Sequence, residues 1–354
     1  MREYGIGIWG AGWVAGAHLE AYLAQPECRI AAIGSRRLES AQALAERHGL
    51  TCPCFTDYEA FLAQPGLDIV SICTPHHLHP RNCILAARAG KHVYVEKPIA
   101  VTLDGLYAMR DAVREAGVRT IVGFVPRWTP LVARLHEIVR GGALGDLVLV
   151  DADYWHSRVR PENYRRRATG GSALLLGGCH AIDAVRYITG LDPIEVFAHS
   201  AQVRTSPDEP YEFDCAEACL VRYSNGAVGR VSAVVKGHVP YQFNIDLIGD
   251  RGAVRNNRVS LHEESKEHVF RTLPEPDLSS GDVQHHPFAG LIRHFLDCIE
   301  ADHDSDVNVE RAVLTHEVCF AALLSERSGQ PVALPLGQAE QVAIHELLRC
   351  ATPG

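Results

Sequence analysis

The first sixteen residues constrain the fold of this 354-residue chain more than any other segment. The apolar run at residues 6–9 leads directly into Gly10-Ala11-Gly12-Trp13-Val14-Ala15-Gly16, and a helical pattern follows. Glycines at such a junction let the backbone turn tightly and approach a phosphate, and the helix N-terminus offers free N–H groups and a favourable dipole. The pattern predicts a dinucleotide-binding turn that uses Gly10, Gly12, Trp13 and Val14. A plain strand–turn–helix is the alternative.

The first third of the chain alternates strands with helices. We expect strands at residues 5–9, 29–33, 68–73, 91–95 and 119–124, and helices at 13–24, 39–48, 57–63, 78–89 and 102–116. This alternation predicts an α/β Rossmann domain, a parallel sheet with helices on both faces, which we assign to residues 1–124. A dinucleotide would lie across the carboxyl ends of the strands.

Beyond residue 125 the pattern changes to a run of strands. We expect strands near 146–155, 194–204, 214–223, 227–236 and 241–249, and helices near 129–140, 172–189, 288–301 and 308–328. Consecutive strands of this kind predict a second, α+β domain over residues 125–354, built on a large, mostly antiparallel open sheet.

Composition limits the classes of partner. The net charge of −9 argues against nucleic acid and anionic membranes, since neither attracts an acidic protein. No apolar run approaches the roughly 20 residues that span a bilayer. The first strand begins at once and leaves no room for a signal peptide, so we expect a cytoplasmic protein. The eleven cysteines form no framework, and we expect the pair Cys52-Pro53-Cys54 at a strand edge.

The end of the second expected strand bears on the type of dinucleotide. Ala31-Ala32-Ile33 continues into Gly34-Ser35-Arg36-Arg37, without the carboxylate that usually binds the ribose 2′-hydroxyl of NAD. The sequence therefore favours NADP over NAD, with Ser35 and Arg36 holding the 2′-phosphate. The alternatives are arginines that face water and an arginine that stacks on the adenine of NAD.

Two further motifs resemble those of a known family. They are Ser71-Ile72-Cys73-Thr74-Pro75 with His79, and Glu96-Lys97-Pro98 after the fifth strand. Together with Gly170-Gly171, Gly178, His180 and Asp183, they are similar to the glucose–fructose oxidoreductase, inositol dehydrogenase and MocA (Gfo/Idh/MocA) family, over nearly the whole chain. The resemblance implies an NAD(P)-dependent dehydrogenase or reductase that acts on a CH–OH group of a sugar, sugar derivative or cyclitol. It also implies a homodimer or homotetramer formed through the second domain's sheet.

The resemblance further implies roles for individual residues. Lys97 would lie beside the nicotinamide and hydrogen-bond to the oxygen of the carbon that exchanges hydride, with Pro98 in a cis bond. Oxidation of an alcohol needs a proton acceptor at that oxygen, and an amine can serve. An ordinary exposed lysine is the alternative. The implied cofactor contacts on this side are Thr74, Pro75, His76, His79, Glu96 and Lys97.

The chain departs from the family pattern at the second catalytic motif. The family has an aspartate four residues before a histidine, whereas here Leu176 precedes His180 at that spacing. Residues four apart share a helix face, so the expected partner of His180 is apolar. We therefore expect His180 to carry more of the proton transfer, while Asp183 could orient its imidazole. A structural histidine, and a leucine that shapes an apolar part of the pocket, are the alternatives.

Aromatic and basic residues of the second domain supply candidate substrate contacts. Aromatic faces with hydrogen-bonding edges suit a sugar or cyclitol. The arginines between residues 158 and 167 could hold a carboxylate or phosphate, or could form a solvated loop. The pair His285-His286 has no third ligand at useful spacing, so we expect no metal site. The substrate candidates are Lys97, Arg127, Trp128, Tyr154, Trp155, Tyr164, Leu176, His180 and His285.

Three functions are compatible with the sequence. We favour the oxidoreductase. The second is a redox-assisted glycosidase or lyase of the same family, in which tightly held NAD oxidises a ring hydroxyl, elimination follows and the cofactor is restored. The third is a catalytically silent cofactor-binding regulator, which Leu176 suggests and Lys97 argues against.

Overall fold

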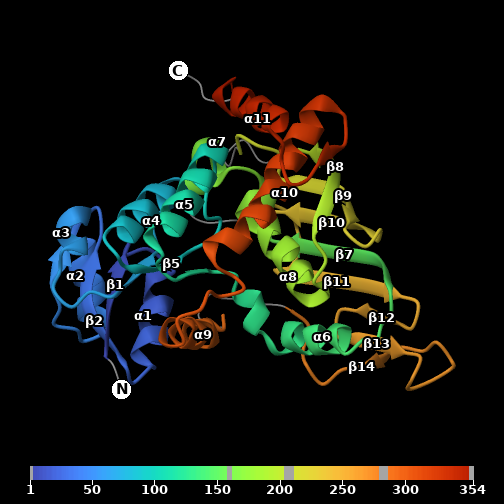
Figure 1. Cartoon of the computed structure of the whole chain (residues 1–354), viewed down its shortest axis with the longest axis horizontal. Helices are drawn as coiled ribbons and strands as arrows, with labels where there is room; N and C mark the ends of the chain where they lie inside the picture. The colour runs from blue at the N-terminus through green and yellow to red at the C-terminus, as the bar shows by residue number, and fades with distance from the viewer. Residues whose placement is uncertain (1–2, 158–161, 203–210, 279–285, 351–354) are drawn as a thin grey trace. The chain divides into compact units, whose positions relative to one another are not determined.

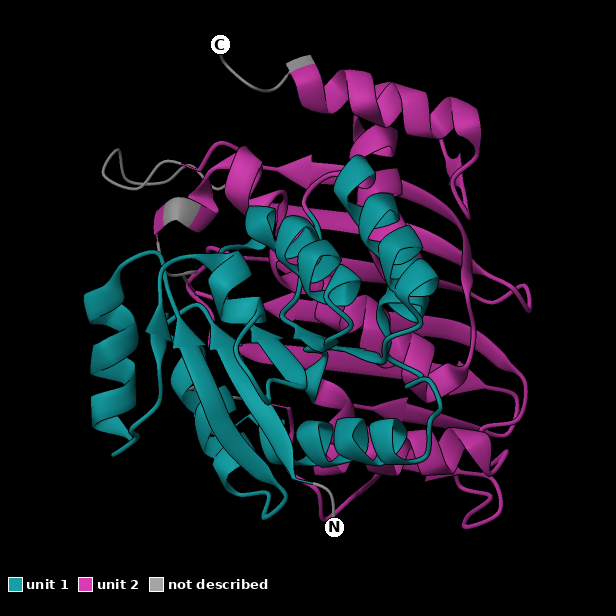
Figure 2. Cartoon of the chain, turned by 60° about the vertical axis from the view of Figure 1, so that its left-hand side comes forward, with its two compact units in different colours: residues 1–100, 104–125, 282–313 teal, residues 101–103, 126–281, 314–354 magenta. Residues whose placement is uncertain are grey.

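The computed structural model describes residues 3–157, 162–202, 211–278 and 286–350 (Figure 1). The chain divides into two compact units (Figure 2). The first comprises residues 1–100, 104–125 and 282–313, and the second comprises residues 101–103, 126–281 and 314–354.

The first unit contains a six-stranded sheet in the order β3-β2-β1-β4-β5-β6, with every neighbouring pair parallel. Its strands are β1 (Tyr4–Trp9), β2 (Cys28–Gly34), β3 (Cys54–Phe55), β4 (Ile69–Ile72), β5 (His92–Val95) and β6 (Thr120–Val122). The helices are α1 (Ala15–Leu23), α2 (Leu38–Arg47), α3 (Tyr58–Leu62), α4 (His79–Arg88) and α5 (Leu103–Ala116), with a 3₁₀ turn η1 (His76–Leu78). Strands β1 and β4 are buried throughout, as expected where helices cover both faces. The predicted Rossmann fold is confirmed, and β3 is the short edge strand that contains Cys54.

Residues 282–313 belong to this first unit, although the boundary drawn from the sequence assigned them to the second domain. Helix α9 (Phe288–Glu300) packs on α1, and the Val122 N–H donates to the Val307 carbonyl at 3.0 Å. Arg119 pairs with Asp302 and Asp304, each at 2.8 Å. The Arg119 contacts alone join residues 183 and 185 positions apart, which a local sequence pattern does not report.

The second unit is built on a nine-stranded sheet in the order β14-β13-β12-β11-β7-β10-β9-β8-β15. Only β7 and β10 pair in parallel among its described strands, so the predicted mostly antiparallel sheet is confirmed. The strands are β7 (Leu147–Trp155), β8 (Pro193–Ala201), β9 (Ala216–Tyr223), β10 (Val228–Val234), β11 (Gln242–Gly249), β12 (Gly252–Arg255), β13 (Arg258–Leu261), β14 (Arg271–Thr272) and β15 (Val332–Ala333). The helical elements are η2 (Val125–Trp128), α6 (Pro130–Arg140), η3 (Glu162–Arg165), α7 (Arg167–Gly170), η4 (Leu174–Gly178), α8 (Cys179–Thr189), α10 (Val309–Ser328) and α11 (Gln338–Cys350).

The helix expected at residues 172–189 is interrupted at its start. Residues of η4 form a π-helical turn, which continues into α8. The buried Glu217 carboxylate, on β9, accepts bonds from the Ser172 hydroxyl at 3.0 Å and from the backbone N–H groups of Ala173 at 3.0 Å and Leu174 at 2.9 Å. It thereby satisfies N–H groups that a helix start leaves without intrahelical partners.

A second carboxyl group, Glu326, lies near Glu217. Burial raises the pKa of Glu217, although the N–H groups of Leu174 and Ala173 act in the opposite direction. Burial and the neighbouring Glu217 carboxylate raise the pKa of Glu326, in the last turns of α10, to about 8. Two carboxyls in such a site favour sharing a proton.

Replacing Glu326 with glutamine should make the stability of the protein less dependent on pH. The folded-state pKa of about 8 exceeds the ordinary value of 4.5, so the folded protein favours the neutral carboxyl. The contribution of this group to folding stability is therefore fully present below pH 4.5 and is lost as the pH rises through 8. We expect the wild-type Tm to fall across this window more steeply than that of Glu326→Gln, measured by thermal unfolding. The exposed-site control Glu346→Gln should follow the wild type, and parallel curves for wild type and Glu326→Gln would contradict the assignment.

Candidate active site

The glycine turn between β1 and α1 is shaped for close approach to its neighbours. Gly10 has a φ of +106°, and a Cβ there would lie 2.6 Å from the Cys73 carbonyl, so only glycine fits. Gly12 and Trp13 are exposed. Helix α1 begins without a side-chain cap and without an acidic residue in its first turn. The turn therefore fits the pyrophosphate of a dinucleotide, whose charge the first N–H groups of α1 would bind.

The loop after β4 is tied to the segment after β5 by His79. This imidazole is fully buried, with Nδ1 2.8 Å from the Pro98 carbonyl oxygen and Nε2 2.7 Å from the Thr74 carbonyl oxygen. The Asn82 side chain donates to the Thr74 hydroxyl at 3.0 Å. His79 thus holds the Thr74 loop through main-chain contacts. The predicted contacts of Thr74, Pro75, His76 and His79 with a cofactor stay predictions.

Glu96, Lys97 and Pro98 directly follow β5. The Lys97–Pro98 bond is cis, as the resemblance implied, and Lys97 is half-buried. Glu96 Oε1 lies 3.0 Å from His18 Nε2 and accepts from the Tyr94 hydroxyl at 3.3 Å. Burial raises the pKa of Glu96, but the charges of His18 and Lys97 more than offset it, so the pKa is lowered. A carboxylate and a lysine amine therefore lie at the carboxyl end of β5, where Rossmann folds bind their ligands.

The Glu96 carboxylate also depends on a glycine of the neighbouring segment. A Cβ on Gly123, just after β6, would lie 2.6 Å from Glu96 Oε1. His18, Tyr94 and Gly123 therefore surround the carboxylate. The sequence pattern does not point to His18 and Gly123, because their contacts with Glu96 join segments that are distant along the chain.

Ser35 and Arg36 follow β2 at the same edge of the sheet. The Ser35 N–H donates to the Phe55 carbonyl at 3.0 Å, which fixes the backbone there. Arg36 and Arg37 are exposed. The position fits a group that binds the adenosine ribose, and it is compatible with a 2′-phosphate.

In the second unit, His180 lies among aromatic rings. It is the second residue of α8, 4% exposed, and its ring centroid is 6.3 Å from Tyr154 and 6.0 Å from Phe243. Tyr154 makes edge contacts with Tyr241 at 5.6 Å and Phe243 at 5.3 Å. Burial raises the pKa of Tyr154 well above its usual value, so its hydroxyl stays protonated. The sequence pattern does not point to Tyr241 and Phe243, because the register that places Phe243 opposite Tyr154 is a property of the sheet.

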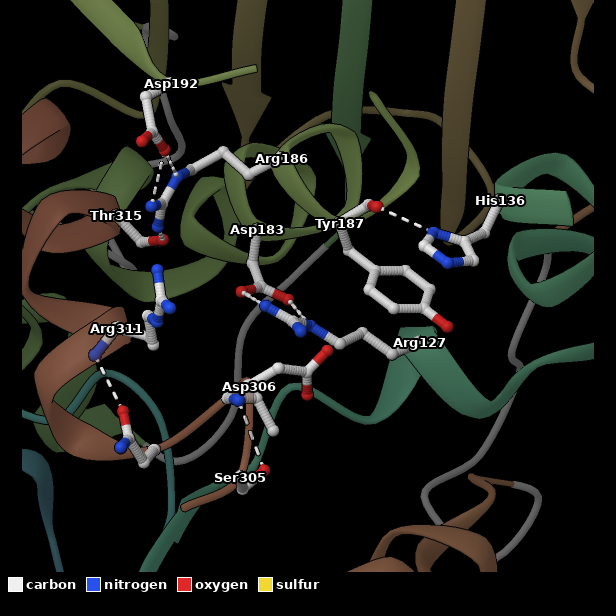
Figure 3. Close-up of polar contacts among 12 residues, drawn as sticks. Arg127, His136, Asp183, Arg186, Tyr187, Asp192, Ser305, Asp306, Arg311 and Thr315 are labelled. Carbon is white, nitrogen blue, oxygen red and sulfur yellow. Dashed lines mark hydrogen bonds and ion pairs between the residues drawn. The ribbon is translucent and has the colours of Figure 1, made fainter. Parts of the chain in front are cut away.

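Arg127 and Asp183 form a buried, two-pronged ion pair (Figure 3). The Arg127 guanidinium donates to Asp183 Oδ2 at 2.8 Å and to Oδ1 at 2.7 Å, and its Cζ lies 4.9 Å from the centre of the Tyr187 ring. Both carboxylate oxygens of Asp183 thus bind Arg127, which differs from the suggested role in orienting the His180 imidazole. The pair joins η2 to α8 and gives both residues a structural role. A substrate contact by Arg127 stays a prediction.

The other substrate candidates are spread over the second unit. Trp155 alternates with Tyr154 along β7, so the two side chains point to opposite faces of the sheet. Trp128 and Tyr164 are half-buried in η2 and η3, and Leu176 is 4% exposed in the π-helical turn. His285 lies outside the described residues. The structure therefore brings together Tyr154 and His180, but not Trp155.

In the described parts of the chain, no group of three or more His, Cys, Asp or Glu side chains could hold a metal ion. None of the helices there has the length and apolar character needed to cross a membrane.

Comparisons with known proteins agree with this architecture. Residues 4–124 match the model of an oxidoreductase family with an NAD-binding Rossmann fold, GFO/IDH/MocA, and residues 132–255 match the GFO/IDH/MocA C-terminal domain. A levoglucosan dehydrogenase of Pseudarthrobacter phenanthrenivorans is 29% identical over 291 residues, 72% of this chain and 73% of that protein. The scyllo-inositol 2-dehydrogenase (NAD⁺) of Bacillus subtilis is 25% identical over 319 residues, 89% and 91% of the two chains.

A solved structure extends the likeness to the whole fold. The structure of a levoglucosan dehydrogenase in complex with NADH and levoglucosan matches with a TM-score of 0.84 at 25% identity, over 94% of this chain and 100% of the other. The two family models match part of each unit, and the matched residues include the glycine turn, Lys97 and His180. The chain therefore belongs to the GFO/IDH/MocA family of NAD-binding oxidoreductases.

Proposed function

We propose that the protein is a dehydrogenase that oxidises a secondary hydroxyl of a sugar, sugar derivative or cyclitol with a nicotinamide dinucleotide. The observation that carries the proposal is the Glu96–Lys97 pair at the carboxyl end of β5, in a unit with an NAD-binding fold. The relatives named for levoglucosan and scyllo-inositol support the substrate class.

A bound nicotinamide ring would supply the hydride acceptor. Lys97, in its neutral amine form, then takes the proton of the substrate hydroxyl, and the Glu96 carboxylate balances the positive charge that the amine acquires. His180 provides a second group that can exchange or share a proton with a substrate hydroxyl. The rings of Tyr154, Tyr241 and Phe243 offer apolar faces that suit the C–H groups of a sugar or cyclitol ring.

Turnover with a substrate panel tests the proposal. Purified protein is mixed with NAD⁺ or NADP⁺ and with inositols, anhydrosugars, aldoses and glucosides, and reduced cofactor is measured by absorbance. We expect stoichiometric reduction of the cofactor with at least one member. Binding of the cofactor without reduction by any member would contradict the proposal.

Replacing Lys97 with methionine should abolish most of the turnover. The variant removes the proton acceptor but keeps the length of the side chain, so kcat should fall roughly 100-fold or more while cofactor affinity changes little. The matched control is Lys266→Met, at an exposed position of the second unit. Initial rates and a cofactor-binding titration give both quantities, and a kcat within a few-fold of the wild type would rule out this role for Lys97.

We also infer that Ser35 and Arg36 admit a 2′-phosphate, so that NADP⁺ is preferred to NAD⁺. The exposed guanidinium of Arg36 and the lack of a carboxylate at the end of β2 support the inference, while the NADH in the related structure points to NAD.

Replacing Arg36 with alanine separates these possibilities. Loss of a charge-assisted bond to phosphate should lower kcat/KM for NADP⁺ about tenfold or more and leave kcat/KM for NAD⁺ nearly unchanged. Arg47→Ala, at the exposed end of α2, is the control. Equal losses with both dinucleotides would instead favour an arginine that stacks on adenine.

We further propose that a second copy of the chain covers one face of the nine-stranded sheet. Helix α8 packs against β7 on one face, and the opposite face exposes apolar side chains that include Leu220 at 63% and Val228 at 53%. Leu149 and Phe197 lie in the same patch, together with residues of both charges. Apolar groups mixed with both charges can be self-complementary across a two-fold axis. Exposed apolar patches of this kind are typical of interfaces.

Replacing Leu220 with aspartate should dissociate the assembly. The charge would be buried without a partner in the interface, so the mass measured by light scattering should fall from dimer or tetramer toward monomer. Val342→Asp, which places the same charge on the exposed side of α11, should keep the wild-type mass. A monomeric wild type, or an unchanged mass for Leu220→Asp, would overturn the proposal.

A further inference from the structure

His18 occupies a closed aromatic site in the first unit. It lies on α1, is fully buried, and its imidazole packs between the rings of Tyr94 at 4.3 Å and Phe288 at 4.8 Å. Tyr94 comes from β5 and Phe288 begins α9, so three elements enclose one side chain. An apolar residue would fill this space at a lower cost in desolvation free energy, because a buried polar ring needs hydrogen-bond partners.

Both ring nitrogens of His18 have partners. Nδ1 lies 2.8 Å from the Ser71 hydroxyl on β4, and Nε2 lies 3.0 Å from Glu96 Oε1. A carboxylate only accepts, so Nε2 donates, and the hydroxyl can accept from Nδ1. The titratable groups that face the ring are Glu96 and Tyr94 of the β5 segment and Cys73 after β4, with Tyr22 nearby on α1. Burial lowers the pKa of His18, but Cys73 and Glu96 more than offset it and raise the pKa to about 10.

The imidazolium and the carboxylate therefore form an ion pair in which His18 is fully buried and Glu96 is largely buried. Glu96 has little room to leave it, since Tyr94 donates to the same oxygen and the backbone at Gly123 closes the other side. Lys97 is the next residue, and its charge acts on the same carboxylate. If the Glu96 carboxylate were displaced, the distance between its negative charge and the Lys97 amine would change.

We propose that His18 is a positioning residue for the reaction, which holds the Glu96 carboxylate in place beside Lys97. The inference rests on the proposed function of Lys97, and it adds a residue that is outside the glycine turn and does not itself exchange the proton. His18 acts through Glu96. A merely space-filling histidine would instead affect the stability of the α1–α9 packing alone.

Two polar variants of His18, with side chains of different length, distinguish positioning of Glu96 from packing alone. The amide nitrogen of glutamine can take the place of Nε2 and donate to Glu96, whereas that of asparagine corresponds to Nδ1 and cannot reach the carboxylate. We expect His18→Asn to lower kcat about tenfold or more and His18→Gln to keep kcat within about threefold, with cofactor KM nearly unchanged in both. The exposed His303→Gln is the control and should match the wild type.

A double-mutant cycle checks that the effect passes through Glu96. If it does, His18→Asn combined with Glu96→Gln should lower kcat no further than the larger single loss. Losses that multiply, or a wild-type kcat in His18→Asn, would overturn the proposal. A variant that lowers only Tm, with full kcat in its folded fraction, would assign His18 to packing alone.

A spectroscopic measurement keeps the test independent of turnover. The ring ¹⁵N shifts of His18 in the intact protein should report an imidazolium at about pH 8 in the wild type, and the titration should move to lower pH in Glu96→Gln. A neutral ring at that pH in the wild type would overturn the ion pair. Failure of every substrate in the panel would contradict the proposed function, while these shifts would still decide the state of His18.

Discussion

The contact between Gly10 and the Cys73 carbonyl is the constraint on which the nucleotide-binding edge depends. A side chain at residue 10 would need space that the neighbouring backbone already fills, 2.6 Å from its Cβ. The close approach brings the carboxyl ends of β1 and β4 together, and the Gly10 N–H bonds to the Gly34 carbonyl on the other side at 2.7 Å. The three loops that follow β1, β2 and β4 are thus held by backbone contacts, so their free N–H groups and side chains can face a ligand.

Behind this edge, the first unit keeps a charge pair in its interior. A buried ion pair is a weak source of stability, because desolvation offsets most of the attraction. Its value is geometric: His18 and Glu96 are satisfied only in one arrangement, with Ser71 and Tyr94 at the remaining positions. Segment 282–313 contributes Phe288 to this site, which explains why a part of the chain far from the glycine turn belongs to the same unit.

In the second unit too, a buried carboxylate satisfies polar groups, here at the start of the helical segment that contains His180. The π-helical turn and its N–H groups need acceptors, and Glu217 reaches them from a strand of the sheet. Turns of the π type cost stability and are frequent at functional sites. The Arg127–Asp183 pair fixes the middle of α8 in the same way, so His180 lies on a helix that is held at two points.

Local pattern determined the parts of this protein that depend on neighbours in sequence. The strand–helix alternation, the glycine turn and the change to a mostly antiparallel sheet follow from short-range periodicity, and the proposed roles of Lys97 and His180 come from motifs with fixed spacing. Only the tertiary structure decided the contacts that join distant segments. These are His18 with Glu96, Glu217 with the start of the π-helical turn, Phe243 opposite Tyr154, and residues 282–313 against α1. The physical reason is that a buried polar side chain needs a hydrogen-bond partner, and that partner is whichever group the fold brings within reach. The spacing of residues along the chain does not indicate which group that is.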